Sequence, residues 1–144
     1  MPATVITFEA TDVTYNTARM NGNVADNTNV TARGFVWGQT SECNQWSWEE
    51  SSSASGAYSN YRSDCNAEWT YYYKAYVWDS VAEARVYGDV ESWTNPAAPV
   101  VPGIETKNAS SISYNSATLN GLIGGITDES VTKRGFDWGE TGSY

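Results

Sequence analysis

Two segments of this chain repeat one another about 100 residues apart. Residues 11–22 (TDVTYNTARMNG) align with residues 110–121 (SSISYNSATLNG), and residues 33–40 (RGFVWGQT) align with residues 134–141 (RGFDWGET). The second copy carries two extra residues between these blocks, which predicts a loop of variable length there. A repeat of this period is too long for a solenoid and is typical of tandem β-sandwich domains.

A proline-rich segment separates the two copies. Residues 95–103 (NPAAPVVPG) contain three prolines, which favour an extended, semi-rigid connection. The sequence therefore predicts a full domain over residues 1–94, a linker over 95–103 and a partial second copy over 104–144. By the alignment, this second copy holds only the first three strands of a sandwich.

The partial copy is expected to be unstable by itself. About 40 residues without a disulfide or a metal rarely bury enough surface to fold alone. Leu119, Phe136 and Trp138 correspond to core residues of the first copy and would be exposed beside open strand edges. Two explanations stay open. Either the natural chain continues past Tyr144, or another chain completes the domain through strand addition or packing.

Short alternating segments predict strands throughout the first copy, and no capped segment shows the 3.6-residue period of a helix. Met20 is matched by Leu119, whereas its neighbour Arg19 becomes Thr118, so Met20 is predicted to face the core.

The next strand has a core face and a solvent face. Phe35 and Trp37 recur as aromatic residues in the second copy, whereas Val36 becomes Asp137. An unpaired buried carboxylate would be costly. We therefore predict that Phe35 and Trp37 lie in the core and that Val36 faces water.

Residues 69–78 (WTYYYKAYVW) form the strongest predicted strand. Strand alternation separates its side chains into two sets, Tyr71, Tyr73, Ala75 and Val77 on one face, and Tyr72, Lys74, Tyr76 and Trp78 on the other. A further strand is predicted over residues 81–90, interrupted at Gly88.

The segments YNSATLNG, KRGFDWG and YYYKAY, in this order, resemble fibronectin type III-like repeats of bacterial, archaeal and phage surface proteins. The resemblance implies an all-β fold, an antiparallel fibronectin type III or immunoglobulin-like β-sandwich. It also implies that Tyr71 is a tyrosine corner, whose hydroxyl bonds to backbone a few residues upstream. Cys65 departs from the family, which usually has a core leucine there. The fold itself serves many roles.

The composition argues against several functions. The chain has no histidine, which removes the commonest general base and zinc ligand. Its net charge of −9 disfavours nucleic-acid binding. Glu49 and Glu50 would point to opposite faces of a strand and so could not flank one substrate bond. We predict no enzymatic activity, no cofactor and no bound metal; calcium at the polar run 25–31 is a minor alternative.

No apolar run is long enough to span a membrane, and no signal peptide is visible at the N-terminus.

Cys43 and Cys65 are the only cysteines, and each follows a predicted strand within polar sequence. We predict a disulfide between them, since the fold is typical of surface proteins. Two free thiols in the core are the alternative.

The chain has more aromatic residues than one small core can absorb. A candidate binding surface therefore comprises Trp46, Trp48, Tyr72, Tyr76 and Trp78, with Trp69 nearby in the sequence. Packing against another protein is the favoured interpretation, and packing within the domain and stacking on sugar rings are the alternatives.

Together these features predict a non-enzymatic structural or interaction module on the exterior of an assembly. The candidates are a virion capsid or tail decoration protein and an extracellular filament subunit. Its expected location is extracellular or on a virion surface, and its expected partners are copies of itself or other subunits. The main alternative is a carbohydrate-binding cell-adhesion module whose partners are glycans. An accessory domain of a secreted hydrolase is the third hypothesis.

Overall fold

The computed structural model describes residues 3–125 and 131–140, whose regular secondary structure is antiparallel β-strand with no helix among them. The chain divides into two compact units, Met1–Ala98 and Pro99–Tyr144. The strands of the first unit are β1 (Thr4–Thr11), β2 (Ala18–Asp26), β3 (Val30–Gly38), β4 (Trp46–Glu50), β5 (Gly56–Arg62), β6 (Thr70–Asp79), β7 (Ala84–Tyr87) and β8 (Glu91–Thr94). The second unit contains β9 (Gly103–Ser110) and β10 (Thr118–Gly124).

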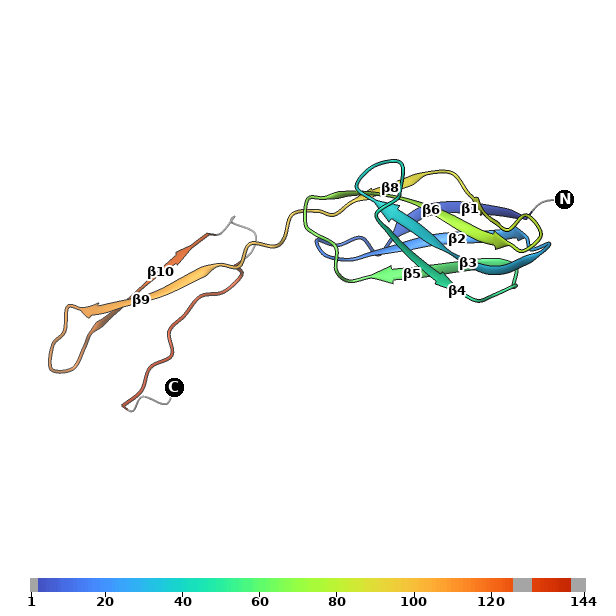
Figure 1. Ribbon diagram of the computed structural model, residues 1–144. Helices are drawn as coiled ribbons and strands as arrows, with labels where there is room; N and C mark the ends of the chain where they lie inside the picture. Colours follow the sequence, from blue (N-terminus) through green and yellow to red (C-terminus); the bar gives the residue numbers. More distant parts are fainter. Residues whose placement is uncertain (1–2, 126–130, 141–144) are drawn as a thin grey trace. The chain divides into compact units, whose positions relative to one another are not determined.

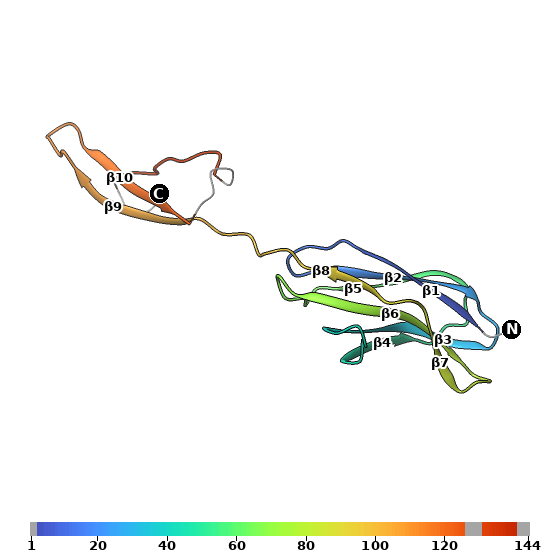
Figure 2. The same cartoon turned by 90° about the horizontal axis from the view of Figure 1, so that it is seen from above.

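The first unit is a β-sandwich, as predicted (Figures 1 and 2). One sheet has the order β1-β2-β5. The other has the order β4-β3-β6-β7, and β8 pairs with the opposite half of β6. β1 begins at one end of this sandwich and β8 ends at the other (Figures 1 and 2).

The core lies between the two sheets, and the predicted inward face of each strand supplies it. Met20, Phe35, Tyr73 and Val77 are completely or almost completely buried. The four side chains of residues 69–78 that were predicted to face inward all belong to the core between the sheets. The predicted alternation of that strand is therefore confirmed. The ring of Phe35 lies 4.9 Å from that of Tyr58 on the opposing sheet.

Polar side chains also connect the two sheets. The Tyr58 hydroxyl on β5 lies 3.0 Å from the carbonyl oxygens of both Gly34 and Tyr76 and donates its proton to one of them. The backbone N–H of Ala75 donates to Oγ1 of Thr7 on β1 (3.1 Å). These bonds satisfy polar groups that the sandwich buries.

Within the strand predicted over residues 81–90, the structure has only β7, and β8 begins just after that range at Glu91. The two strands pair with different halves of β6. β7 ends directly before Gly88, as the predicted interruption requires, and the cause is steric. A Cβ at Gly88 would lie 2.6 Å from Oγ1 of Thr7, so only glycine lets β1 approach this closely.

Val36 faces away from the core as predicted, but the prediction that it faces water is wrong. It is buried in a second, smaller cluster on the outer face of the β4-β3-β6-β7 sheet, together with Cys43 and Tyr76. The segment between β3 and β4 brings Cys43 to this face and covers it.

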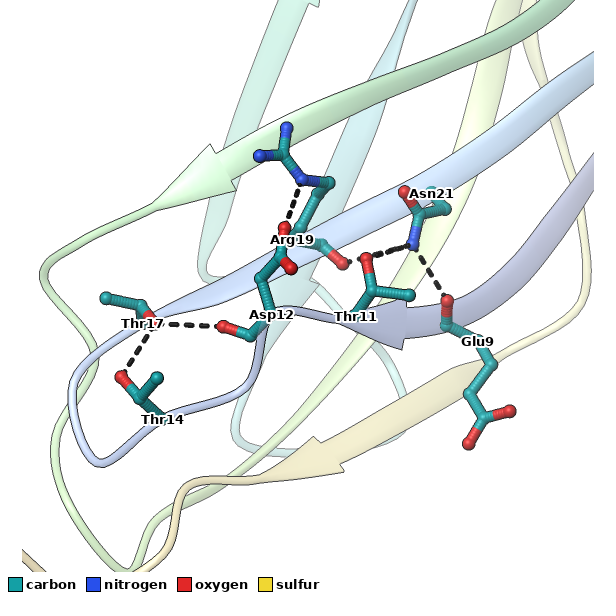
Figure 3. A network of polar contacts seen from close by, with 7 residues as sticks. All are labelled: Glu9, Thr11, Asp12, Thr14, Thr17, Arg19 and Asn21. Atoms are coloured by element: carbon teal, nitrogen blue, oxygen red, sulfur yellow. Dashed lines mark hydrogen bonds and ion pairs between the residues drawn. The ribbon is translucent and has the colours of Figure 1, made fainter.

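A side-chain network holds the turn between β1 and β2 (Figure 3). Nδ2 of Asn21 donates to the carbonyl oxygen of Glu9 (2.9 Å) and to Oγ1 of Thr11 (3.1 Å). The hydroxyls of Thr14 and Thr17 lie 2.7 Å apart and share a hydrogen bond.

The β9–β10 hairpin of the second unit reproduces this network. Nδ2 of Asn120 donates to the carbonyl oxygen of Asn108 (2.9 Å) and to Oγ of Ser110 (3.0 Å), and the hydroxyls of Ser113 and Ser116 lie 2.7 Å apart. The repeated sequence therefore encodes the same hairpin twice.

The described residues of the second unit do not form the third strand that the sequence predicts. Residues 131–140 have no regular secondary structure, and residues 126–130 and 141–144 lie outside the described part. Leu119 and Phe136 are about half exposed and Trp138 is 77% exposed. In the first unit the equivalent side chains are covered by β5, β6 and β8, and this unit has no described equivalents of those strands.

Candidate functional site

The five residues of the predicted binding surface separate onto two faces of one sheet. Trp46 and Trp48 pair directly with Trp37 and Phe35, which places them on the inner face at the β4 edge. The three residues from β6, Tyr72, Tyr76 and Trp78, lie on the outer face. The set therefore does not form one continuous surface.

Two of the five are packed within the domain. Trp48 lies against the core, stacked on Phe35 at 6.2 Å between ring centroids. Tyr76 is fully buried under the guanidinium of Arg85, which lies 4.3 Å from its ring centroid. Burial raises the pKa of Tyr76, and the hydrogen bond that its hydroxyl donates to Glu49 (2.6 Å) raises that pKa further.

Trp46 instead opens onto a cleft, which we call the tryptophan cleft. It lies beside the end of β5, the segment 63–69 and the start of β6, and it has a volume of about 150 Å³. Its lining residues are Trp37, Trp46, Arg62, Asp64, Cys65, Asn66, Trp69, Tyr71 and Trp93.

Aromatic rings form the floor and two walls of the cleft. Tyr71 and Trp93 are buried and stacked, with ring centroids 5.0 Å apart. Trp46 and Trp69 each contact Tyr71, at 6.3 and 6.2 Å, and remain 43% and 42% exposed. Two accessible indoles thus stand on a rigid, buried support.

An ion pair forms the polar part of the cleft. The guanidinium of Arg62 lies 4.8 Å from the ring centroid of Trp37, and its Nη2 lies 2.5 Å from Oδ2 of Asp64. Such a cation above an indole is held by the negative face of the ring. No sequence motif marks Arg62 and Asp64, so neither residue was predicted for this site. Trp69 stood out in the sequence only as one of the surplus aromatic residues.

The segment 63–69 that borders the cleft is fixed by the tyrosine corner. The backbone N–H of Asn66, which lies five residues before Tyr71 in the sequence, donates a hydrogen bond to the Tyr71 hydroxyl (3.1 Å), as the resemblance implies. The expected hydrogen bond between the Tyr71 hydroxyl and upstream backbone is confirmed. Cys65 packs against the core next to it, where the family usually has leucine.

The predicted disulfide is absent from the structure, and both cysteines are free thiols. Cys43 lies in the outer-face cluster, whereas Cys65 packs against the core between the sheets. A whole β-sheet therefore separates the two environments. Burial raises the pKa of both thiols.

The prediction that Glu49 and Glu50 face opposite sides of a strand is confirmed. Glu49 accepts the Tyr76 hydroxyl on the outer face, and Glu50 pairs with Arg33 (2.5 Å), whose guanidinium lies over Tyr58. The two carboxylates thus have separate polar partners on opposite faces of the sheet.

Asp26, the carboxylate of the polar run 25–31, is occupied within its own turn. Its Oδ1 accepts the Thr28 hydroxyl (2.6 Å) and the Thr28 backbone N–H (2.9 Å). These bonds hold the pKa of Asp26 below its ordinary value. Across residues 3–125 and 131–140, no three acidic or cysteine side chains cluster as metal ligands would. The same residues form no helix long and apolar enough to cross a membrane.

No family model and no curated protein matches this chain. Among solved structures, it is similar to the sensor domain of the anti-sigma factor RsgI4 from Pseudobacteroides cellulosolvens. The shorter form of that domain aligns with a TM-score of 0.57 at 14% identity, over 68% of this chain and 98% of that one. The longer form aligns with a TM-score of 0.55 at 14% identity, over 78% and 100%.

At this level of identity the likeness establishes the fold. The chain is an antiparallel β-sandwich protein, and the tryptophan cleft of that sandwich combines accessible aromatic rings with an ion pair.

Proposed function

We propose that this chain is a non-enzymatic structural and interaction module on the exterior of an assembly, either a virion decoration protein or an extracellular filament subunit. The observation that supports this most is the path of the chain through the first unit. It enters at one end of the sandwich and leaves at the other, which is the arrangement that end-to-end repeats require (Figure 1).

A buried side chain anchors the end of the first unit from which the chain leaves. Asn95 is fully buried, and its Nδ2 donates to the carbonyl oxygens of Thr14 (2.6 Å) and Thr17 (2.9 Å). The chain is therefore fixed to the β1–β2 turn before the prolines begin.

Membership of the fibronectin type III-like class is part of this proposal. The tyrosine corner and the division into β1-β2-β5 and β4-β3-β6-β7 sheets support it. The partners we propose are further copies of the same module or other subunits of the assembly.

Antibody labelling of the native particles or filaments tests this function. We expect labels at regular intervals on the outer surface, with the chain accessible without permeabilisation. Labelling confined to the interior would contradict the proposal.

A carbohydrate-binding adhesion module is the second candidate function. The specific observation in its favour is that Trp46 and Trp69 are exposed on the same cleft. Binding of the 144-residue chain to an array of glycans, and loss of that binding in Trp46→Ala, would support it; an array with no signal would oppose it.

A further inference from the structure

We propose that the tryptophan cleft holds a single pyranose ring of an uncharged glycan, stacked on Trp46 and Trp69 and hydrogen-bonded to the Arg62–Asp64 pair. This inference rests on the second candidate function and is independent of where the module is displayed.

The size of the cleft limits the occupant. A volume of about 150 Å³ is below the range typical of pockets for drug-sized ligands. A single sugar ring suits a space of this size. A helix or strand from a protein partner is too large, and only a single side chain of a protein would enter.

The two accessible indoles suit a ring with C–H groups on its faces. The π-face of tryptophan carries negative charge, and the axial hydrogens of a pyranose carry a small positive charge, so the two stack favourably. Trp46 is held by Trp37 and Tyr71, and Trp69 is held by Tyr71. Because these contacts already fix the rings, little side-chain entropy remains to be lost on binding.

The charges at the cleft favour an uncharged ligand. Arg62 and Asp64 neutralise one another at 2.5 Å, so neither requires a counter-ion from a partner. The pair still offers both functions that a sugar hydroxyl needs, because the guanidinium donates N–H groups and the carboxylate accepts O–H groups. A charged side chain would compete with this existing pair, whereas a hydroxyl group can join it.

The proposal is tested with the whole 144-residue chain against a panel of uncharged probes. The panel contains methyl glucoside, methyl galactoside, methyl mannoside and methyl N-acetylglucosaminide, together with their β- and α-linked oligosaccharides. Binding is followed by calorimetry and by the intrinsic tryptophan fluorescence. We expect at least one probe to bind and to change this fluorescence.

Four variants locate the site. Trp46→Ala and Trp69→Ala are each expected to weaken binding of that probe at least tenfold. Asp64→Ala, at the exposed rim, is expected to weaken it several-fold with an unchanged melting temperature, which separates loss of binding from loss of folding. Trp78→Ala is the matched control, because Trp78 is similarly exposed but lies on the outer face of the sheet.

The inference is overturned if no uncharged saccharide binds, or if a probe binds equally to the Trp46, Trp69 and Asp64 variants. Binding of aromatic or acidic peptides at these tryptophans, without saccharide binding, also overturns it and identifies the cleft as a protein contact. None of these outcomes changes the result expected from antibody labelling of the native assembly. The proposed role on the exterior is therefore tested separately from saccharide binding.

Discussion

The indole Nε1 of Trp93 donates a hydrogen bond to Oδ1 of Asn95, at 3.0 Å, in the buried end of the sandwich. The same asparagine donates from its Nδ2 to two carbonyl oxygens of the β1–β2 turn. One side chain thus connects the last strand of the first unit to the first hairpin.

Asn95→Ala is therefore expected to destabilise the first unit by about 2–4 kcal/mol, because it leaves the buried Trp93 indole N–H without a partner and removes a hydrogen bond from each of two part-buried backbone carbonyls. Urea denaturation followed by tryptophan fluorescence measures this. Asn44→Ala, at an exposed asparagine, is the control and should change stability by no more than about 0.5 kcal/mol.

Tyr71→Phe tests the tyrosine corner. The change removes the acceptor of the Asn66 N–H and keeps the aromatic ring in place, so we expect a loss of about 1–2 kcal/mol. Tyr61→Phe, which alters an exposed ring, should be nearly neutral. Equal effects of the two variants would show that the hydrogen bond contributes nothing.

Trp37→Ala tests the core assignment from the repeat. Trp37 is 6% exposed and contacts both Trp46 and the guanidinium of Arg62. We expect a cost of about 3–5 kcal/mol from lost burial and the cavity left behind. Trp78→Ala on the outer face should cost much less in the same denaturation experiment.

The two thiols are expected to react in a fixed order. Cys65 is half-buried and should be alkylated slowly in the native protein, whereas Cys43, at 2% exposure, should react only after unfolding. Because burial raises the pKa of both groups, less of each is the reactive thiolate near neutral pH.

Intact mass after alkylation in denaturant without a reductant should show two added groups, and a reductant should leave the melting temperature unchanged. A protein that accepts no alkylating group under these conditions would contain the disulfide after all.

Stability should fall in strongly alkaline solution. Burial raises the pKa values of Tyr58, Tyr73 and Tyr76 above the ordinary value near 10. A group whose pKa is higher in the folded state than in the unfolded state contributes its full stabilisation of the fold below the unfolded-state pKa. That stabilisation is lost progressively as the pH rises from the unfolded-state pKa through the folded-state pKa.

The free energy of unfolding should therefore be insensitive to these tyrosines up to about pH 9 and decline above about pH 10. Denaturation at a series of pH values, with phenolate absorbance recorded in parallel, checks this. Tyr76→Phe should make the alkaline decline less steep; an unchanged slope would show that Tyr76 does not contribute.

The sequence determined the fold class, the repeat and the inward faces of the central strands. These features are local: strand alternation fixes which side chains share a face, and the Asn21 network of the β1–β2 hairpin joins residues no more than 12 positions apart. Comparison of the two copies identified Met20, Phe35 and Trp37 because a core position keeps its apolar character when its neighbours change.

Tertiary structure alone decided what covers each face. The alternation that turned Val36 away from the core could not reveal that the loop carrying Cys43 would bury it, nor that this places Cys43 and Cys65 on opposite sides of a sheet. The close approach of Thr7 to Gly88 likewise separates β7 from β8 through a contact between distant residues.

The tryptophan cleft arises in the same way. Its walls and floor come from β3, β4, β5, β6, β8 and the segment 63–69, and Arg62 reaches Trp37 only because two sheets pack face to face. Local patterns specify which side of a strand a residue occupies, whereas a binding site depends on long-range packing that brings separate strands together.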